Sequence, residues 1–211
     1  MGRTKLQRFN NVRKMKNIVE FDQENIKDSI SKFIDNKPVI LELACGRGEY
    51  TIELAELLPE KKFIGIDYQG ERLWYGGTVS TEKDLTNTLF VRAFIDKIEE
   101  YIEPNSIDEI WITFSDPQVK KARKRITSPN FLKKYQKILK PKGLLHLKTD
   151  SQLLFEYSLT SLENNDFNII ELNNNVTLPN SNPLLNIQTY FETKHRLQNE
   201  KIYYLKSFFT K

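Results

Sequence analysis

The chain of 211 residues has a single cysteine, Cys45. One thiol excludes an intramolecular disulfide and fits a reducing compartment. No apolar run approaches the roughly 20 residues of a membrane-spanning helix, and the N-terminus has no apolar segment like that of a signal peptide. We therefore expect a cytoplasmic protein that does not insert into a membrane.

Signatures of several enzyme classes are also absent. No set of Cys, His or carboxylate residues has the spacing of metal ligands, so we expect no metal ion. Cys45 lies inside a glycine-containing loop, which argues against a nucleophilic role, and no Asn-Pro-Pro-Tyr-like tetrapeptide marks methylation of an exocyclic amine. His146 lies in an apolar strand and is interpreted as a core residue, while His195 lies in a charged segment that indicates no role.

The amino-acid composition is that of a globular protein. Hydrophobic residues make up 39% of the chain and aromatic residues 11%, which is enough for a sizeable core. We expect a single domain over residues 21–211, preceded by a basic tail over residues 1–20 that need not be ordered.

The net charge of +4 is small, but the positive charges are clustered. One group of cations precedes the first acidic residue, Glu20, a second runs from Lys120 to Arg125, and a third lies within residues 133–142. Such clusters indicate a polyanionic partner, although a solvated tail explains the first group equally well.

Short apolar runs alternate with amphipathic helical patterns along the chain. The predicted strands cover residues 39–43, 63–67, 89–91, 107–114, 144–148, 167–172 and 202–208. The predicted helices cover residues 51–58, 95–102, 131–139 and 151–162, with one more beginning at residue 71. This alternation predicts an α/β fold with a doubly wound, mostly parallel sheet, whose last two strands pair antiparallel at one edge. Ligands bind such sheets at the carboxyl ends of the strands.

The turn after the first predicted strand has features of a nucleotide-binding loop. Gly46 and Gly48 allow a ligand to approach the backbone, and about 20 residues on Asp67 ends the second strand, where a carboxylate can bind the two hydroxyls of a ribose. A dinucleotide fingerprint would have a third glycine at Thr51, and an acid before the loop, Glu42, suits a cationic ligand better than a pyrophosphate. S-adenosylmethionine, a cation without phosphate, fits this pattern; a plain strand-to-helix turn is the alternative.

The most informative segment is Phe114–Arg125. An apolar run over residues 110–112 leads to Asp116 and Pro117, and five of the next eight residues are cations. Asp116 is therefore expected at the end of a buried strand, facing a cleft, with a basic loop beside it. This arrangement suits a carboxylate that handles a small group while cations hold a polyanion; a solvated surface loop is the alternative.

Together these segments resemble the bacterial tRNA (guanine-N7)-methyltransferase family, from about residue 38 to the C-terminus. The resemblance rests on Leu41–Gly48, Phe63–Asp67, Trp111–Pro117 with the basic residues that follow, Leu147–Asp150 and Thr189–Glu192. It implies a seven-stranded, Rossmann-like methyltransferase fold with S-adenosylmethionine as cofactor and tRNA as partner. The implied reaction methylates N7 of the variable-loop guanosine, tRNA position 46. Whether the chain is a monomer or a homodimer stays open.

The resemblance also implies a role for individual residues. Asp116 would be catalytic, in contact with both cofactor and guanine. The cofactor-binding residues would be Glu42, Gly46, Gly48, Asp67 and Asp116. The tRNA contacts would be Lys120, Asp150, Thr189, Tyr190, Phe191 and Glu192, with Lys121, Arg123, Lys124 and Arg125 as further basic candidates. Asp150 has a competing role as the cap of the next helix.

The sequence departs from the family pattern at three places. Ala44 stands where the family usually has glycine, and Ala93 replaces an Asp or Asn that contacts the adenine side of the cofactor. The Trp-Pro that usually follows Asp-Pro is Gln118-Val119, and the basic loop is about two residues shorter. These differences bear on cofactor affinity and on RNA contacts more than on the type of reaction.

The implied reaction needs little acid–base chemistry, because guanine N7 has a lone pair and no proton. Positioning of the two reactants should supply most of the rate, and Asp116 would stabilise the positive charge that moves onto the purine. Three other functions stay open on sequence alone. They are methylation of a small molecule, dinucleotide-dependent oxidation or reduction, and RNA binding without catalysis.

Overall fold

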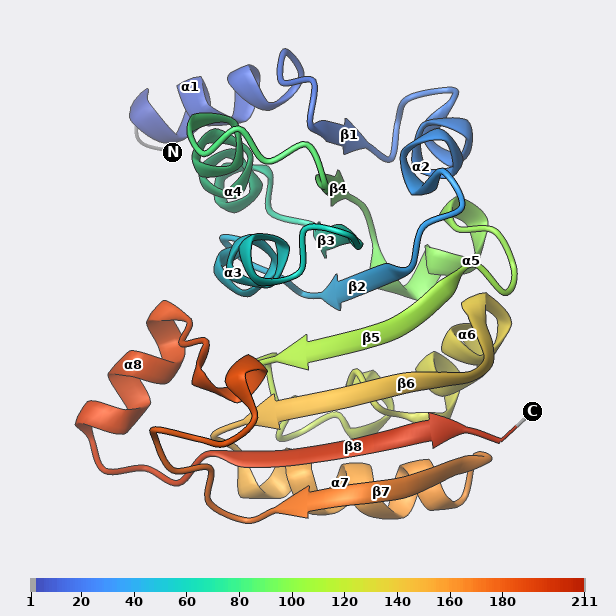
Figure 1. Ribbon diagram of the computed structural model, residues 1–211, viewed down its shortest axis with the longest axis vertical. Helices are drawn as coiled ribbons and strands as arrows, with labels where there is room; N and C mark the ends of the chain where they lie inside the picture. The colour runs from blue at the N-terminus through green and yellow to red at the C-terminus, as the bar shows by residue number, and fades with distance from the viewer. Residues whose placement is uncertain (1–2, 211) are drawn as a thin grey trace. The chain divides into compact units, whose positions relative to one another are not determined.

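A computed structural model describes residues 3–210 of the chain, which divides into two compact units, residues 1–103 and 104–211 (Figure 1). Residues 1, 2 and 211 lie outside the described residues, as do the side chains of Arg3 and Lys5 from the first basic group. No helix in the described range is long and apolar enough to cross a membrane.

The first unit has four parallel strands in the order β1-β4-β3-β2. Their bounds are Ile18–Glu20 for β1, Val39–Leu43 for β2, Lys62–Asp67 for β3 and Thr88–Arg92 for β4. Every residue of β2 and β4 is buried, as expected for parallel strands that are covered on both faces. The carboxyl ends of the four strands therefore meet at one edge.

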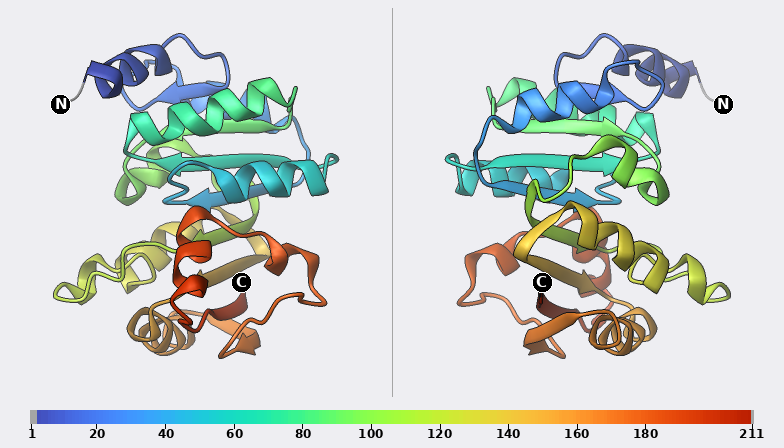
Figure 2. Two further views of the ribbon diagram at one scale, coloured as in Figure 1. Left: turned by 90° about the vertical axis from the view of Figure 1, so that its left-hand side faces the viewer. Right: turned by 90° about the vertical axis from the view of Figure 1, so that its right-hand side faces the viewer.

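Helices cover both faces of this half-sheet. They are α1 (Arg3–Val12), α2 (Ile26–Ile34), α3 (Glu49–Leu57), α4 (Gly70–Glu82), the 3-10 turn η1 (Ile95–Lys97) and α5 (Ile98–Tyr101). Figure 2 shows α3 and α4 on one face and α2 with α5 on the other. The core beneath α4 combines Val12, Ile18, Leu73 and Phe90, so the N-terminal segment packs into this unit.

The second unit has strands in the order β5-β6-β8-β7. Their bounds are Ile107–Thr113 for β5, Leu139–Thr149 for β6, Phe167–Asn173 for β7 and Tyr203–Phe209 for β8. β5 and β6 are parallel, whereas β8 is antiparallel to both β6 and β7. The remaining elements are η2 (Ala122–Lys124), α6 (Pro129–Ile138), α7 (Gln152–Glu163), η3 (Pro183–Asn186) and α8 (Tyr190–Leu197). Figure 1 shows α8 beside the carboxyl ends of β5 and β6.

The predicted α/β class, with mostly parallel strands and an antiparallel end, is confirmed. The described residues form eight strands rather than seven, because Ile18–Glu20 pairs with β4. The predicted tail therefore contains a helix and a strand. A three-residue run that ends in a charged side chain gives a weak strand signal, and the charge of Glu20 is matched by Arg92, 72 positions away.

Candidate active site

The loop after β2 turns sharply into α3. Ala44, Gly46 and Gly48 all have positive φ, at 57°, 57° and 70°, a region that costs an ordinary L-residue about 1–2 kcal/mol. A Cβ at Gly46 would meet no atom within 4 Å, whereas a Cβ at Gly48 would lie 2.3 Å from Cε1 of Phe90. Gly48 is therefore required by packing, while Gly46 borders open space that a ligand can use.

Asp67 lies at the carboxyl end of β3, as predicted, and is fixed by the backbone of the neighbouring loops. Its Oδ2 accepts a hydrogen bond from the Gly46 N–H at 3.0 Å, and its Oδ1 accepts one from the Gln69 N–H at 2.8 Å. Burial raises the pKa of the Asp67 carboxyl, and these hydrogen bonds oppose the rise. The carboxylate is thus held next to the open space at Gly46.

Glu42 lies beneath the same loop and is 2% exposed. Its Oε2 accepts hydrogen bonds from the Thr51 N–H at 2.9 Å and from the Thr51 hydroxyl at 2.5 Å. Thr51 is in the first turn of α3, where backbone N–H groups have no partner within the helix. Glu42 therefore fixes the start of α3, and its predicted contact with a cofactor stays a prediction.

Cys45 is buried between these two acids. Burial raises the pKa of its thiol well above the ordinary value, and the charges of Glu42 and Asp67 raise it further. A thiol that stays protonated at neutral pH is a poor nucleophile. The interpretation of Cys45 as a non-catalytic residue agrees with this environment.

Next to Asp67 is an aromatic cluster that sequence reasoning missed. Tyr68 and Phe94 follow β3 and β4, and their ring centroids lie 4.3 Å apart. Both are partly exposed, at 49% and 36%. Behind them the Arg92 guanidinium donates to Oε1 of the buried Glu20 at 2.9 Å and to the Tyr68 carbonyl at 3.2 Å. Aromatic residues one and two positions after two strand ends are the signal that could have identified this surface.

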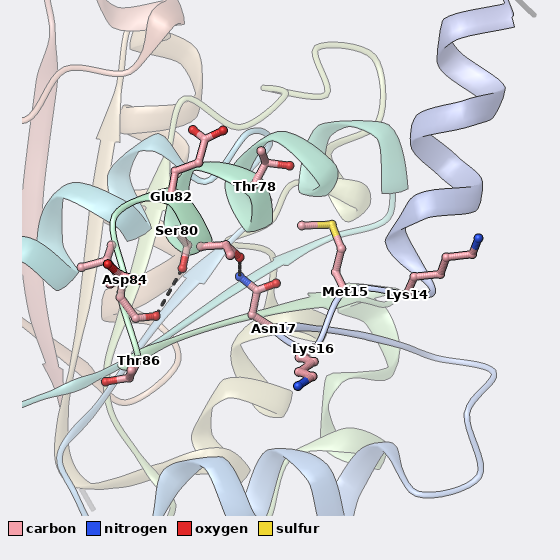
Figure 3. A pocket seen from close by; sticks show the side chains of 11 residues that line it. Lys14, Met15, Lys16, Asn17, Thr78, Ser80, Glu82, Asp84 and Thr86 are labelled. Atoms are coloured by element: carbon pink, nitrogen blue, oxygen red, sulfur yellow. Dashed lines mark hydrogen bonds between the residues drawn. The ribbon is translucent and has the colours of Figure 1, made fainter.

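A pocket of about 550 Å³ in the first unit is lined by residues 14–17, the last turn of α4 and residues 84–86 (Figure 3). Residues 14–17 precede β1 and residues 84–86 precede β4, so the pocket lies at the amino ends of the strands. Asp67 lies at their carboxyl ends. The lining mixes Lys14 and Lys16 with Glu82 and Asp84, and this mixture selects no particular ligand. The pocket is separate from the predicted cofactor loop.

In the second unit, Asp116 is exposed three residues after the end of β5. Its Oδ1 accepts a hydrogen bond from the Gln118 N–H at 2.8 Å, which closes a turn of the kind that Asp often forms. Phe114 and Gln118, on either side, have φ of 48° and 47°. Two residues of positive φ around one acid indicate that the loop is fixed in an unusual conformation, a feature enriched at functional sites.

The cations after Asp116 divide into two kinds. Lys120, Lys121, Arg123 and Lys124 are exposed, whereas Arg125 is 8% exposed. The Arg125 guanidinium donates to the Pro117 and Val119 carbonyls at 3.2 and 3.4 Å and lies 4.5 Å from the ring centre of Tyr157. Arg125 therefore braces the loop from inside, and the other four side chains face solvent.

The predicted segment Thr189–Glu192 forms the start of α8, and its four residues also divide into two kinds. Thr189 caps the helix by accepting a hydrogen bond from the Glu192 N–H at 3.2 Å, and Glu192 is fully buried. Tyr190 and Phe191 are 56% and 44% exposed. The Thr-x-x-Glu spacing, typical of a helix start, is a sequence signal that could have predicted this helix.

Glu192 belongs to a buried ionic cluster. Its Oε2 lies 2.7 Å from Nζ of Lys148, which is also fully buried, and its Oε1 accepts from Arg196 at 2.7 Å. Lys148 also donates to the Leu185 and Ile187 carbonyls at 2.9 and 2.8 Å. Burial lowers the pKa of Lys148 to about 8, and Glu192 opposes that fall. The cluster ties α8 and the segment before it to β6.

Asp150 follows β6 and does not cap α7. Ser151 is the cap, since its hydroxyl accepts a hydrogen bond from the Leu154 N–H at 3.2 Å. Asp150 Oδ2 instead lies 3.6 Å from Nε2 of His195 on α8, and Nδ1 of His195 lies 2.5 Å from Oε2 of Glu200. His195, to which the sequence assigned no role, thus lies beside a predicted substrate contact.

The fold is of the S-adenosylmethionine-dependent methyltransferase type. The structure of 16S rRNA methyltransferase KamB aligns with a TM-score of 0.71 over 90% of this chain and 96% of that one, at 10% identity. A 16S rRNA (adenine(1408)-N(1))-methyltransferase with cosubstrate SAM, from Catenulisporales acidiphilia, aligns with a TM-score of 0.61 over 88% and 92%, at 12% identity. At such low identity these similarities establish the fold.

Sequence comparisons identify the family. A family model described as a putative methyltransferase matches residues 36–205. A tRNA (guanine-N(7)-)-methyltransferase of Cytophaga hutchinsonii is 38% identical over 98% of this chain and 97% of its own length. One of Bacteroides thetaiotaomicron is 37% identical over 98% and 86%. The chain belongs to the tRNA (guanine-N7)-methyltransferase family, as the sequence resemblance implied.

Proposed function

We propose that this protein transfers a methyl group from S-adenosylmethionine to N7 of a guanosine in tRNA, giving 7-methylguanosine, and that the guanosine is the one in the variable loop at position 46. The observation that carries the proposal is Asp116. This carboxylate is exposed at a strand end, held in a fixed turn, and followed by four exposed cations. Family membership supports the choice of tRNA as the polyanion.

The residues of the first unit fit the cofactor. When bound, S-adenosylmethionine supplies an electrophilic methyl group on a positively charged sulfur. Asp67 would accept hydrogen bonds from the ribose hydroxyls, since backbone N–H groups hold its carboxylate in place beside the loop. The open space at Gly46 would allow the ligand to contact the backbone. Tyr68 and Phe94 would offer ring surface to the adenine, in place of the acid missing at Ala93.

Asp116 would act on the guanine. Its carboxylate would accept hydrogen bonds from N1–H and the exocyclic amine, two donors that adenine does not present in this arrangement. The same negative charge would stabilise the positive charge that the purine gains as N7 is methylated. No proton has to leave N7 before attack, so a second acid or base is not required.

Lys120, Lys121, Arg123 and Lys124 would bind phosphates, since these four residues are exposed in the loop that follows Asp116. Arg125 is assigned no phosphate contact, because its guanidinium is already engaged within the loop. The target base has to leave its stack to reach a strand-end carboxylate, as in other base-modifying enzymes.

The segment Thr189–Glu192 would contribute to RNA binding through its exposed half. Tyr190 and Phe191 offer aromatic faces on which unstacked RNA bases can lie. Thr189 and Glu192 would act indirectly, by starting α8 and by anchoring it to Lys148. This division predicts loss of tRNA affinity on removal of the two rings, and loss of folding stability on removal of the buried acid.

The test uses purified protein, S-adenosylmethionine and unmodified tRNA transcripts, followed by mass spectrometry of the nucleosides. We expect 7-methylguanosine with the wild-type protein, none with Asp116→Ala, and none on a transcript with adenosine at position 46. A different methylated nucleoside would overturn the assigned acceptor. Methylation of a small molecule without any tRNA product would overturn the assigned substrate class.

A further inference from the structure

His195 lies between two carboxylates at the carboxyl ends of β5 and β6. One ring nitrogen, Nδ1, lies 2.5 Å from Oε2 of Glu200, and the other, Nε2, lies 3.6 Å from Oδ2 of Asp150. The side chain is 23% exposed. Its ring is nearly parallel to that of Phe114, with an angle of 10° and a centroid separation of 6.2 Å.

The neighbours of His195 are the residues that lead to the proposed site. Phe114 immediately follows β5 and lies two residues before Asp116. Asp150 immediately follows β6, the parallel neighbour of β5. The Phe114 N–H also donates to the Lys148 carbonyl at 2.9 Å. A single side chain of α8 thus contacts both strand ends that the proposed function uses.

A metal ion is the alternative occupant of this cluster. Asp150, His195 and Glu200 are the group of described residues that could hold one, with ligand atoms within 4.8 Å of one another. The closest carboxylate oxygens, however, lie beside different ring nitrogens, Glu200 Oε2 beside Nδ1 and Asp150 Oδ2 beside Nε2. One ion binds a single one of those nitrogens, whereas each nitrogen can take its own hydrogen-bond partner.

We propose that His195 is a positioning residue of the methyl-transfer site, an inference that rests on the proposed function. His195 holds the Asp150 carboxylate and the Phe114 ring in the positions in which they contact tRNA. Glu200 completes the arrangement by orienting the ring through Nδ1. Among the described residues, Asp150 and Glu200 are the charged groups that face the ring.

The test separates the two nitrogens of the ring. In His195→Asn the amide nitrogen takes the position of Nδ1 and can reach Glu200, whereas in His195→Gln it takes the position of Nε2 and can reach Asp150. For methylation of tRNA we expect kcat/KM to fall about 10- to 100-fold in His195→Asn and His195→Ala. His195→Gln should stay within about threefold of the wild type. The Kd for S-adenosylmethionine should be unchanged in all three.

A double-mutant cycle gives a second readout that a purely structural role would not move. If His195 acts by holding Asp150, then kcat/KM for tRNA should be about the same in the His195→Ala, Asp150→Ala double variant as in Asp150→Ala alone, because the contact is already lost in the single variant. Losses that add in the double variant would overturn the proposal. Activity that EDTA removes and Zn²⁺ restores would also overturn it.

Two outcomes distinguish this inference from the proposed function. If His195→Asn and His195→Gln lose the same activity and the same thermal stability, His195 only supports the fold. If the wild type makes no 7-methylguanosine, the proposed function fails. The contact between His195 and Asp150 is then tested by NMR of the protein without tRNA or cofactor. An Asp150 carboxyl resonance that shifts in His195→Asn and not in His195→Gln would support it, and unchanged Asp150 resonances would overturn it.

Discussion

The loop after β2 and the loop after β5 begin alike and are held in place by different means. Each starts with a non-glycine residue of positive φ, Ala44 at 57° and Phe114 at 48°. After Ala44 the chain packs inward, with Gly48 against the ring of Phe90. After Phe114 the chain turns out to solvent, and it is braced by the Asp116 turn and the guanidinium of Arg125.

This difference matches the ligands that we assign to the two loops. A small cofactor of constant shape is bound well by a loop whose conformation packing determines completely. An RNA backbone presents hydrated phosphates, which exposed and adjustable cations can follow. We infer that conformation is the critical property of the first loop and charge that of the second.

The largest effect should come from Asp116. Asp116→Asn keeps an oxygen that can accept from the Gln118 N–H and removes only the charge, whereas Asp116→Ala also removes the turn. Both should lower kcat by at least about 10²–10³-fold while tRNA binding survives. Single-turnover assays and filter binding measure the two effects. Full activity in Asp116→Asn would show that the turn matters and the charge does not.

The sequence predicted the buried parallel strands better than the buried ionic contacts, for physical reasons. Parallel strands buried on both faces, such as Val39–Leu43, give continuous apolar runs that local patterns detect. Glu192 and Lys148, by contrast, are buried because they neutralise each other, 44 positions apart, and no local pattern carries that pairing. Asp150 and His195 meet in the same way. The strand β1 was missed because Glu20 depends on distant Arg92.

Disruption of the buried ionic cluster that anchors α8 should strongly lower the stability of the folded protein. Glu192→Gln would leave the Lys148 ammonium buried without its carboxylate. We expect the free energy of unfolding to fall by about 3–5 kcal/mol, measured by urea denaturation. The matched control is Glu163→Gln, at an exposed position at the end of α7, which should change it by less than about 0.5 kcal/mol. Equal effects of the two substitutions would contradict the assigned role.

A matched glycine pair tests the first loop. Gly48→Ala combines a positive φ with a clash against Phe90, so it should cost about 2–4 kcal/mol of stability. Gly46→Ala has open space and should cost only about 1–2 kcal/mol. Its methyl group would occupy the space proposed for the cofactor, so the affinity for S-adenosylmethionine should fall. Denaturation measures the loss of stability, and calorimetric titration measures the affinity for S-adenosylmethionine. Unchanged affinity in Gly46→Ala would show that the cofactor does not bind in this space.

The lowered pKa of Lys148 predicts how stability depends on pH. In the folded protein Lys148 loses its proton near pH 8, whereas in the unfolded chain a lysine holds it to about pH 10.4. Between these values the unfolded state binds more protons, so this group makes the free energy of unfolding rise with pH, by at most about 1.4 kcal/mol per unit. The Lys148→Met variant should lack this contribution. Parallel curves of unfolding free energy against pH for the wild type and Lys148→Met would contradict the prediction.

The smallest expected effect tests whether charge is the property by which the loop after β5 binds tRNA. Lys120→Gln, Lys121→Gln and Arg123→Gln combined should weaken tRNA binding about tenfold or more and reduce the salt slope by two to three units, at roughly 0.7–0.9 per phosphate contact. The matched control neutralises Lys32, Lys37 and Lys142, which are also exposed. Lys37 precedes β2 in the first unit, and Lys142 lies near the amino end of β6, whereas Asp116 follows the carboxyl end of the parallel strand β5. If both triple variants lose the same affinity, net charge rather than the loop attracts tRNA. If only the loop variant does, the exposed cations after Asp116 form the RNA contact surface.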